Sequence, residues 1–255
     1  MVKLSQFTKV RLLVVLAHVL GVWGLINYWD PRWLLLTLVC HIGFLWLGNE
    51  MYVHRFLAHK SFAMPLWLQR VCACLSVFNL FGAPIGVAAT HMTHHKFSDR
   101  EGDPHPASDS VRSWFWIHPR MEKSNNRSVV RRLMRDEWLV MINRRYFSIY
   151  LGTVIALALL DIRIAIYGFL LHVMYAFFCD GLINVVCHKY GYRIAETSDN
   201  SRNNLVVNAF LLFSGAALHN THHAYPNVAG QSRRWYEVDL VGTLIGLIMV
   251  KRKTV

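Results

Sequence analysis

The feature of this chain that most constrains its fold is a set of four long apolar stretches separated by short polar junctions. These stretches cover residues 12–27, 33–49, 147–160 and 164–186, and almost no charged side chain interrupts them. The first two lie near the lower limit of the roughly 17–25 residues with which a helix crosses a bilayer. Only 16% of the 255 residues are charged, against about 25% in a typical soluble domain. The pattern therefore predicts an all-α, polytopic membrane protein with four transmembrane helices.

The junctions between the apolar stretches predict how the helices are connected. The aromatic turn at residues 27–32 joins the first two stretches, and residues 161–163 join the last two, which predicts two helical hairpins. The segment between the hairpins is rich in arginine and lysine, and the positive-inside rule places such a segment in the cytosol. If both hairpins cross and return, segments 50–146 and 187–255 lie together on the cytosolic face of a single domain, 1–255.

Three further apolar segments predict helices that do not span the membrane. Residues 66–89 contain several polar and helix-breaking residues, so we expect their first half to form a helix in the membrane interface. Residues 205–218 and 240–250 predict shorter apolar helices. The N-terminus is first basic and then apolar, as in a signal peptide, but no small-residue cleavage site follows, which indicates a retained anchor.

The composition argues against several other classes of protein. The formal net charge is +12 at pH 7. The basic residues flank apolar stretches instead of alternating with aromatic residues on a polar face, which argues against nucleic acid as a partner. The five cysteines lie within apolar stretches and form no CxxC pair, so neither a disulfide framework nor a zinc knuckle is expected.

Histidine is the residue type that points to a chemical function. Nine of the fourteen histidines form four groups, and each group lies where an apolar stretch meets a polar segment. The groups are an HxxxxH motif, two HxxHH motifs and a single residue: His54 and His59; His91, His94 and His95; His219, His222 and His223; and His188. The three histidines of an HxxHH motif project from one face of a helix, because they are three and four residues apart.

The number and spacing of these histidines predict two metal ions. Imidazole binds iron, copper, nickel and zinc, and nine imidazoles exceed what one ion can use. Two redox metals with open positions, held side by side, suit oxygen chemistry at a histidine-rich iron site. In an α-helix His54 and His59 would point about 140° apart, so they would serve different ions or require the helix to fray between them.

The other five histidines are predicted not to bind metal. Three lie in apolar helices, where hydrogen-bonded core residues are expected, and two lie in the polar middle segment, where they would be solvated or lie beside the site. These are His18, His41 and His172, and His105 and His118, respectively.

The motifs resemble those of the integral-membrane fatty acid desaturases of the delta-9 acyl type. The three histidine boxes read HRFLAHKSF, HMTHHKFSD and HNTHHAYP, and each is close to the pattern of that family. The sequences DPH at 103–105, NVVCH at 184–188 and SRNN at 201–204 are also similar to family motifs. The resemblance covers roughly residues 48–226, which is most of the chain.

The resemblance implies a cofactor, a reaction and partners. The nine histidines would bind two iron ions, and Asn184 would approach one of them through a water molecule. With O2 as co-substrate, the enzyme would insert a cis double bond, at the delta-9 position, into an acyl chain carried by CoA, by acyl carrier protein or by a membrane lipid. A separate ferredoxin or b-type cytochrome would supply electrons. Candidates for orienting the imidazoles or facing the substrate are Asp99, Asp103, His105, Arg202 and Asn203.

Two segments depart from the family pattern. Residues 50–53, Glu-Met-Tyr-Val, stand where the family often has small residues. Residues 215–217, Gly-Ala-Ala, stand where the family often has an acidic triplet such as Gly-Glu-Gly. Both changes leave every histidine in place but lie near the expected acyl tunnel, which selects chain length and double-bond position.

The basic face and the reaction each allow more than one interpretation. The arginines would dock the acidic carrier of the acyl chain, or they would set topology and attract anionic lipid at about 1 kcal/mol per residue; these are Arg112, Arg120, Arg127, Arg131, Arg132 and Arg202. A related membrane di-iron hydroxylase or acetylenase would use the same centre. A non-catalytic metal-handling membrane protein is an alternative of another class, but it predicts histidines along the membrane interior.

Overall fold

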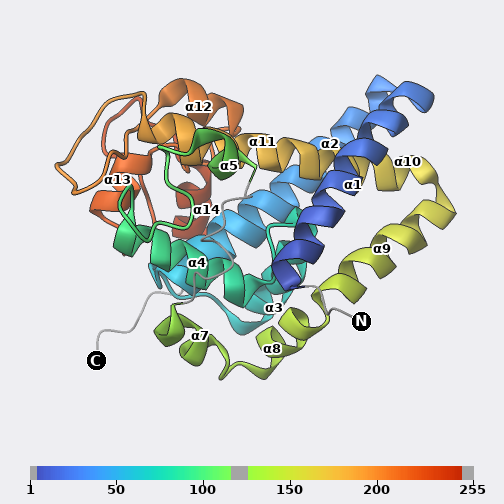
Figure 1. Ribbon diagram of the computed structural model, residues 1–255, viewed down its shortest axis with the longest axis horizontal. Helices are drawn as coiled ribbons and strands as arrows, with labels where there is room; N and C mark the ends of the chain where they lie inside the picture. Colours follow the sequence, from blue (N-terminus) through green and yellow to red (C-terminus); the bar gives the residue numbers. More distant parts are fainter. Residues whose placement is uncertain (1–4, 116–125, 249–255) are drawn as a thin grey trace.

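The computed structural model describes residues 5–115 and 126–248 (Figure 1). Within these ranges the secondary structure is helical, and extended segments pair only through isolated bridges, from Asn203 to Tyr192 and to Leu218. The predicted all-α class is confirmed. His118 and Arg120, both of which figured in the predictions, lie outside the described residues, and so do the last two residues of the helix predicted at 240–250.

Among the described residues, three helices are long and apolar enough to cross a membrane, namely Gln6–Asn27, Pro31–Ala58 and Ile162–His188. The first of them is α1. The second consists of η1 (Pro31–Trp33), α2 (Leu34–His41) and the π-helical η2 (Ile42–Ala58). The third consists of α10 (Ile162–Ala165), η4 (Ile166–Leu170), α11 (Leu171–Val185) and η5 (Val186–His188).

The fourth predicted span corresponds to α9 (Tyr146–Leu160), which is apolar but has only 15 residues. At 1.5 Å per residue this helix is about 22 Å long, which is less than the thickness of about 30 Å of a typical hydrocarbon core. α9 therefore belongs to the apolar part of the molecule without reaching the length of the other three helices.

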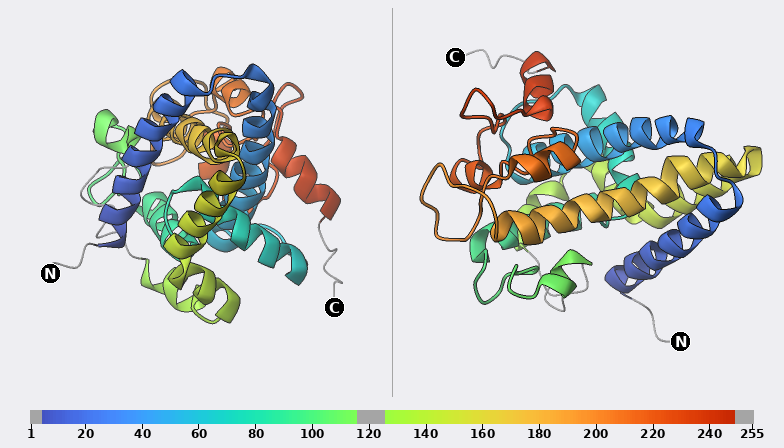
Figure 2. Two further views of the ribbon diagram at one scale, coloured as in Figure 1. Left: turned by 90° about the vertical axis from the view of Figure 1, so that its right-hand side faces the viewer. Right: turned by 90° about the horizontal axis from the view of Figure 1, so that it is seen from above.

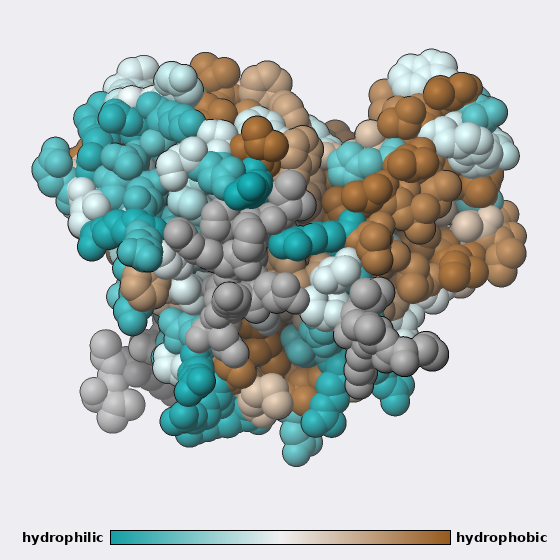
Figure 3. Space-filling view, in the orientation of Figure 1, coloured by the Kyte–Doolittle hydropathy of each residue, from teal (hydrophilic) through white to brown (hydrophobic). Residues whose placement is uncertain are grey.

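Both predicted hairpins are present, and their turns lie at the same end of the molecule, on the right in Figure 1 and in the right-hand view of Figure 2. Tyr167 of η4 ties the first turn to the second hairpin. Its hydroxyl group accepts a hydrogen bond from the Asp30 N–H at 2.8 Å and donates one to the Tyr28 carbonyl at 2.9 Å. Figure 3 shows hydrophobic residues gathered at this end and hydrophilic residues at the opposite end.

The segment predicted as an interfacial helix forms three elements with a bend of 78° between the second and third: α3 (Leu66–Leu75), η3 (Ser76–Asn79) and α4 (Pro84–Phe97). Gly82 adopts a φ of +120° in the bend. Pro84 then begins α4, a position where its missing N–H breaks no helical hydrogen bond. The Asn79 side chain donates to the Phe44 carbonyl at 2.7 Å, which fixes the bend against the second spanning helix.

The predicted helix at residues 205–218 is wrong beyond its first six residues. α12 spans Leu205–Phe210, and Leu212 and Phe213 then take positive φ values of 53° and 60°. Gly215 follows with a φ of +86°, and a Cβ there would lie 2.2 Å from the Asp239 carboxylate. Hydrophobicity alone does not reveal this turn, because most of the residues that follow α12 are buried although they are not helical.

The polar end of the molecule carries short helices and loops: α5 (Ser110–Trp114), α7 (Arg127–Leu133), α8 (Glu137–Arg144), α13 (His219–Ala224) and α14 (Leu240–Ile248). A buried ion pair joins its C-terminal loops to η2. Arg55 donates to both carboxylate oxygens of Asp239, at 2.9 and 3.0 Å, and to the carbonyls of Ala229 and Ser214. These bonds hold the segments on either side of α13 against η2.

Candidate metal centre

Eight of the nine predicted histidines form two compact sets. The first histidine set is His54, His59, His91 and His222, and the second histidine set is His94, His188, His219 and His223. Within each set, one ring nitrogen of every member lies within 4.8 Å of those of the others. The ninth, His95, lies between the sets. Its Nε2 atom is 2.8 Å from Nε2 of His222, and its ring stacks on that of His223 with centroids 4.3 Å apart.

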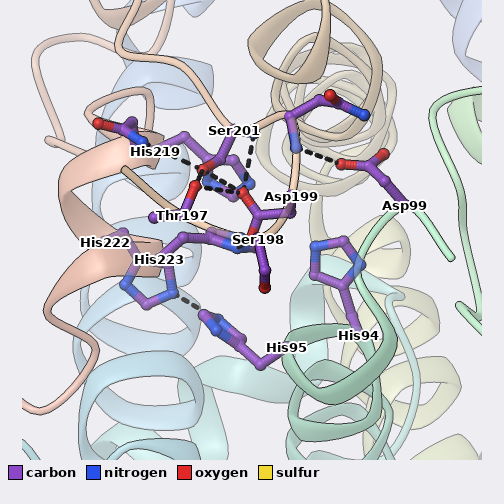
Figure 4. A network of polar contacts seen from close by, with 12 residues as sticks. His94, His95, Asp99, Thr197, Ser198, Asp199, Ser201, His219, His222 and His223 are labelled. Atoms are coloured by element: carbon purple, nitrogen blue, oxygen red, sulfur yellow. Dashed lines mark hydrogen bonds and ion pairs between the residues drawn. The ribbon is translucent and has the colours of Figure 1, made fainter. Parts of the chain in front are cut away.

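Four parts of the chain supply these rings, and two helices contribute to both sets. α4 provides His91 to the first histidine set and His94 to the second. α13 provides His222 to the first set and its two other histidines to the second. Each HxxHH motif therefore straddles the two sets, which keeps them adjacent. α4 and α13 lie side by side at the polar end of the molecule (Figures 1 and 4).

The second spanning helix was predicted to end at residue 49, but its last element, η2, continues to Ala58. The HxxxxH motif therefore lies at the end of this helix and not in a segment after it. The His59 N–H donates to the His54 carbonyl at 3.2 Å, and this five-residue step is that of a π-helix. The wider turn brings residues five apart to the same side. Both rings accordingly join the first histidine set, with centroids 5.2 Å apart. Neither arrangement expected for an α-helix is present.

Carboxylates orient four of the rings through Nδ1. Asp99 contacts His188 at 2.8 Å, Asp103 contacts His94 at 2.9 Å, Asp199 contacts His223 at 2.7 Å, and Glu50 contacts His54 at 2.9 Å. A carboxylate that accepts the Nδ1 proton leaves the lone pair on Nε2, the atom that faces the set.

Two of these carboxylates were not among the sequence candidates. Asp199 lies in a polar loop 24 residues before His223, a separation that carries no signal in the sequence. Figure 4 shows this loop, where Thr197 and Ser201 hold the Asp199 carboxylate. Glu50 does carry a signal, because it lies four residues before His54 on the same helix, a spacing at which side chains meet.

The electrostatics of the rings favour cations. Burial, followed by the neighbouring imidazoles, lowers the pKa of His219, His222 and His223 well below the ordinary value, so these rings are neutral at pH 7. Burial alone would raise the pKa of Asp103, but the hydrogen bond with the His94 ring lowers it well below the usual range. The site therefore combines neutral imidazoles with ionised carboxylates behind them.

The ring nitrogens themselves show that the donor set fits metal ions. The Nε2 atoms converge in pairs, with 2.7 Å from His59 to His91 and 2.9 Å from His188 to His219. The Nε2 atoms of His94 and His223 are buried and have no hydrogen-bond partner within the described part of the chain, although the carboxylates direct their lone pairs inward. Buried lone pairs that face one another are unfavourable unless a cation lies between them, and imidazole nitrogen is a ligand that iron accepts.

Asn184 lies beside both sets. It lines a cavity of about 70 Å³ together with His54, His91, His94 and His219. Its side-chain amide donates to the Asp180 carboxylate at 2.5 Å. Asp180 and Glu50 also line this cavity, so its wall is polar on the side of η2 and α11.

Phe81, in the bend before α4, is a wall residue that this cavity shares with two larger ones. It lines the small cavity and a cavity of about 380 Å³ between one face of α1 and the rings of Phe115 and Phe177. It also lines a cavity of about 360 Å³ that reaches Asn143 and Tyr146 near α8 and α9. One mainly apolar cavity and one cavity of mixed polarity thus adjoin the small cavity beside the histidines, and Phe81 lines all three.

The remaining sequence candidates lie near the sets but contact them differently. The His105 ring stacks on that of His94 with centroids 4.2 Å apart, and burial lowers the pKa of His105 to about 3. Asn203 is buried, donates to Thr221 and accepts from the Thr221 N–H, so it orients α13. Arg202 is half-buried, and its N–H donates to the Cys187 carbonyl at 2.7 Å.

The histidines predicted to be core residues are buried or half-buried in the spanning helices. His172 contacts the Asn79 side chain at 3.1 Å, and Nδ1 of His18 contacts the Val14 carbonyl at 2.8 Å. His41 departs from the prediction of a hydrogen-bonded residue. Its ring is fully buried against His172 and Tyr175 and has no hydrogen-bond partner among the described residues, because its surroundings are aromatic side chains.

Fold and site together define a class of protein: a helical protein with helices of membrane-spanning length and a cluster of nine histidines, suited to metal binding, at its polar end. The chain belongs to the fatty acid desaturase family, whose model, described as "Fatty acid desaturase", matches residues 31–245. The resemblance seen in the motifs is confirmed, and the family places the chain among oxidoreductases that act in lipid metabolism.

Three relatives illustrate the similarity. The chain is 31% identical over 212 residues to the sn-1 stearoyl-lipid 9-desaturase of Anabaena variabilis, covering 80% of this chain and 76% of the relative. It is 29% identical over 228 residues to an acyl-CoA 5-desaturase of Anemone leveillei, covering 86% of this chain and 69% of the relative. It is 31% identical over 202 residues to Delta-9 acyl-lipid desaturase 2 of Arabidopsis thaliana, covering 76% of this chain and 64% of the relative.

Proposed function

We propose that this protein is an O2-dependent di-iron desaturase that inserts a cis double bond into a fatty acyl chain, at the delta-9 position. The observation that carries the proposal is the convergence of nine imidazoles from four parts of the chain into two adjacent sets. Membership of the fatty acid desaturase family supports the reaction. Two of the relatives named above are described as 9-desaturases, which supports the position of the double bond.

The geometry supports a division of the ligands. The first histidine set, with His95, would hold one iron ion. The second histidine set would hold the other, with Asn184 approaching through a water molecule. When bound, the two ions would supply the activation of O2 and the removal of hydrogen from a methylene group. The residues of the chain orient the imidazoles and exclude water, since most members of the two sets are buried.

The cavities that meet at Phe81 support an acyl chain as substrate. An apolar chain held against Phe81 would present one segment to the small cavity beside the histidines, and fixed placement of this kind is how an enzyme selects one bond among similar ones. The relatives act on acyl-CoA and on acyl lipids according to their names, and acyl carrier protein is a third possible carrier. We propose a ferredoxin or a b-type cytochrome as electron donor.

We further propose that the protein is a multi-pass membrane protein with the histidines on the cytoplasmic side. The polar end carries exposed arginines on α7, on α8 and in the turn between them, namely Arg127, Arg131, Arg135 and Arg144. The positive-inside rule supports a cytoplasmic location for them. Arg112 pairs with Asp109 and Arg132 bonds the Leu57 carbonyl at 2.5 Å, so the other exposed arginines are better placed to dock an acidic carrier or anionic lipid.

The proposal is tested by expressing the chain in a host and analysing its lipids by gas chromatography and mass spectrometry. We expect a new cis alkene, iron in the purified protein at two ions per chain, and loss of both product and iron in His94→Ala and His222→Ala. His18→Gln, outside both sets, should retain the iron. An alcohol or an alkyne would assign a hydroxylase or an acetylenase. Freely exchanging metal without O2 consumption would assign a metal-handling protein.

A further inference from the structure

The carboxylates are distributed unequally between the two histidine sets. In the described residues, three carboxylates contact the second histidine set, namely those of Asp99, Asp103 and Asp199. The first histidine set has one such contact, between His54 and Glu50. The other polar partner in the first set is neutral, because Nδ1 of His222 faces the side-chain amide of Gln231 at 3.1 Å.

This difference has a consequence for the binding of cations. A carboxylate behind an imidazole makes the ring a stronger ligand and balances part of the charge of the ion, and loss of such a partner typically costs 10–100-fold in metal affinity. The second histidine set keeps two carboxylates when one is neutralised. The first histidine set keeps none, so its affinity depends on a single side chain.

Glu50 is placed for this task by its helix. It lies one helical step before His54 in η2, and its Oε2 atom is 2.9 Å from Nδ1 of that ring. The other oxygen, Oε1, is 3.4 Å from the side-chain nitrogen of Asn49. Glu50 is only 5% exposed, and a buried carboxylate is unfavourable unless its charge is compensated. A cation held by the first histidine set would provide that compensation.

We propose that Glu50 is the positioning residue for the metal ion of the first histidine set, and that this ion is the more weakly held of the two. The inference rests on the proposed di-iron function. Glu50 holds the proton of His54 on Nδ1, so that the lone pair of Nε2 faces the set. It also supplies the negative charge that Asp99, Asp103 and Asp199 supply to the second set.

The test measures iron per chain in purified protein and the rate at which a chelator removes it. In the wild-type protein we expect iron to be released in two phases of equal amplitude, and the faster phase should come from the first histidine set. In Glu50→Gln the first phase should be 10–100-fold faster, or the iron content should fall toward one per chain. Asp199→Asn should retain two ions. Glu50→Asp keeps the charge and should retain more iron than Glu50→Gln.

A double variant separates positioning from a merely structural role. Because Glu50 acts through His54, the variant Glu50→Gln/His54→Ala should lose no more iron than His54→Ala alone. Glu237→Gln is the matched control. Glu237 is a buried carboxylate whose partners are Tyr192, Asn203 and two backbone N–H groups, and its neutralisation should leave two ions per chain.

Three results would overturn the inference. The first is that Glu50→Gln releases iron at the wild-type rate. The second is that Glu50→Gln and Asp199→Asn lose equal amounts of iron. The third is that Glu50→Gln/His54→Ala loses more iron than His54→Ala alone. If Glu50→Gln cannot be purified, a single phase that releases both ions from the wild-type protein overturns it equally. Wild-type protein that binds no iron would overturn the proposed function itself, so the two failures are distinguishable.

Discussion

Phe81 lies in the wall that three cavities near the histidines share. Its ring lines all three cavities described above and is only 5% exposed. It lies in the bend between η3 and α4, between Leu80 and Gly82, which both have positive φ values, so its position depends on the backbone of that turn. The size of this one side chain should therefore decide how far an acyl chain advances past the metal centre.

We expect Phe81→Trp to lower the yield of unsaturated product from long acyl chains, because the larger ring narrows the junction of the cavities. Phe81→Leu should shift or broaden the double-bond position. Both variants should keep two iron ions, since Phe81 lines the cavity and belongs to neither histidine set. Product positions are read by mass spectrometry of derivatised lipids. Phe78→Leu is the control, because Phe78 packs on Phe44 and Phe169 in the core; the same product change there would contradict a gating role for Phe81.

At the scale of elements, η2 connects the membrane part of the molecule to the metal centre. Its π-helical end carries His54 and His59 on one side and directs Arg55, which is only 1% exposed, toward Asp239. The two-point contact between the guanidinium and the carboxylate, together with the bonds to two carbonyls, makes η2 the support of the C-terminal loops. The element that supplies the first histidine set therefore also positions α13.

We expect Arg55→Met to destabilise the protein by about 3–5 kcal/mol, because it leaves the Asp239 carboxylate buried without its partner. Iron content should fall as well, since α13 loses its support. Thermal unfolding and metal analysis of the detergent-solubilised protein measure both effects. Arg32→Met breaks the ion pair with Asp30 at the surface, where the Arg32 side chain is 87% exposed, and should leave the melting temperature unchanged. Equal effects of the two substitutions would contradict this account.

At the scale of the whole molecule, the two ends differ in chemistry. The hairpin turns, with exposed Trp29 and Leu160, form one end, and the histidines and the arginines of α7 and α8 form the other (Figures 1 and 3). The proposed orientation follows from this polarity, because the positive-inside rule would keep the basic end in the cytosol.

We expect a cysteine introduced by Trp29→Cys to react with a membrane-impermeant thiol reagent from the outside of intact cells. A cysteine introduced by Arg144→Cys should react only after the membrane is opened or inverted. The wild-type chain, whose cysteines are all free and buried or half-buried, measures the background. Labelling of both positions from the same side would contradict the placement of the two hairpins.

The sequence by itself determined the helical class, the hairpins and the nine histidines. These depend on local patterns: the length of an apolar stretch, and spacings of three and four residues that place side chains on one helical face. The same local reasoning failed at residues 205–218, where buried residues leave the helix, and at the HxxxxH motif, where η2 winds as a π-helix.

Only the tertiary structure decided which rings share a set and which carboxylates orient them. Asp99 meets His188 across 89 positions of the chain, and His54 meets His222 across 168. Contacts over such separations follow from the way the hairpins, the bend before α4 and the Arg55–Asp239 pair bring distant segments together. Glu50 shows the difference most clearly. Its residue type departs from the family pattern at the level of sequence, but its contact with His54 in a buried helix is what connects it to the metal centre.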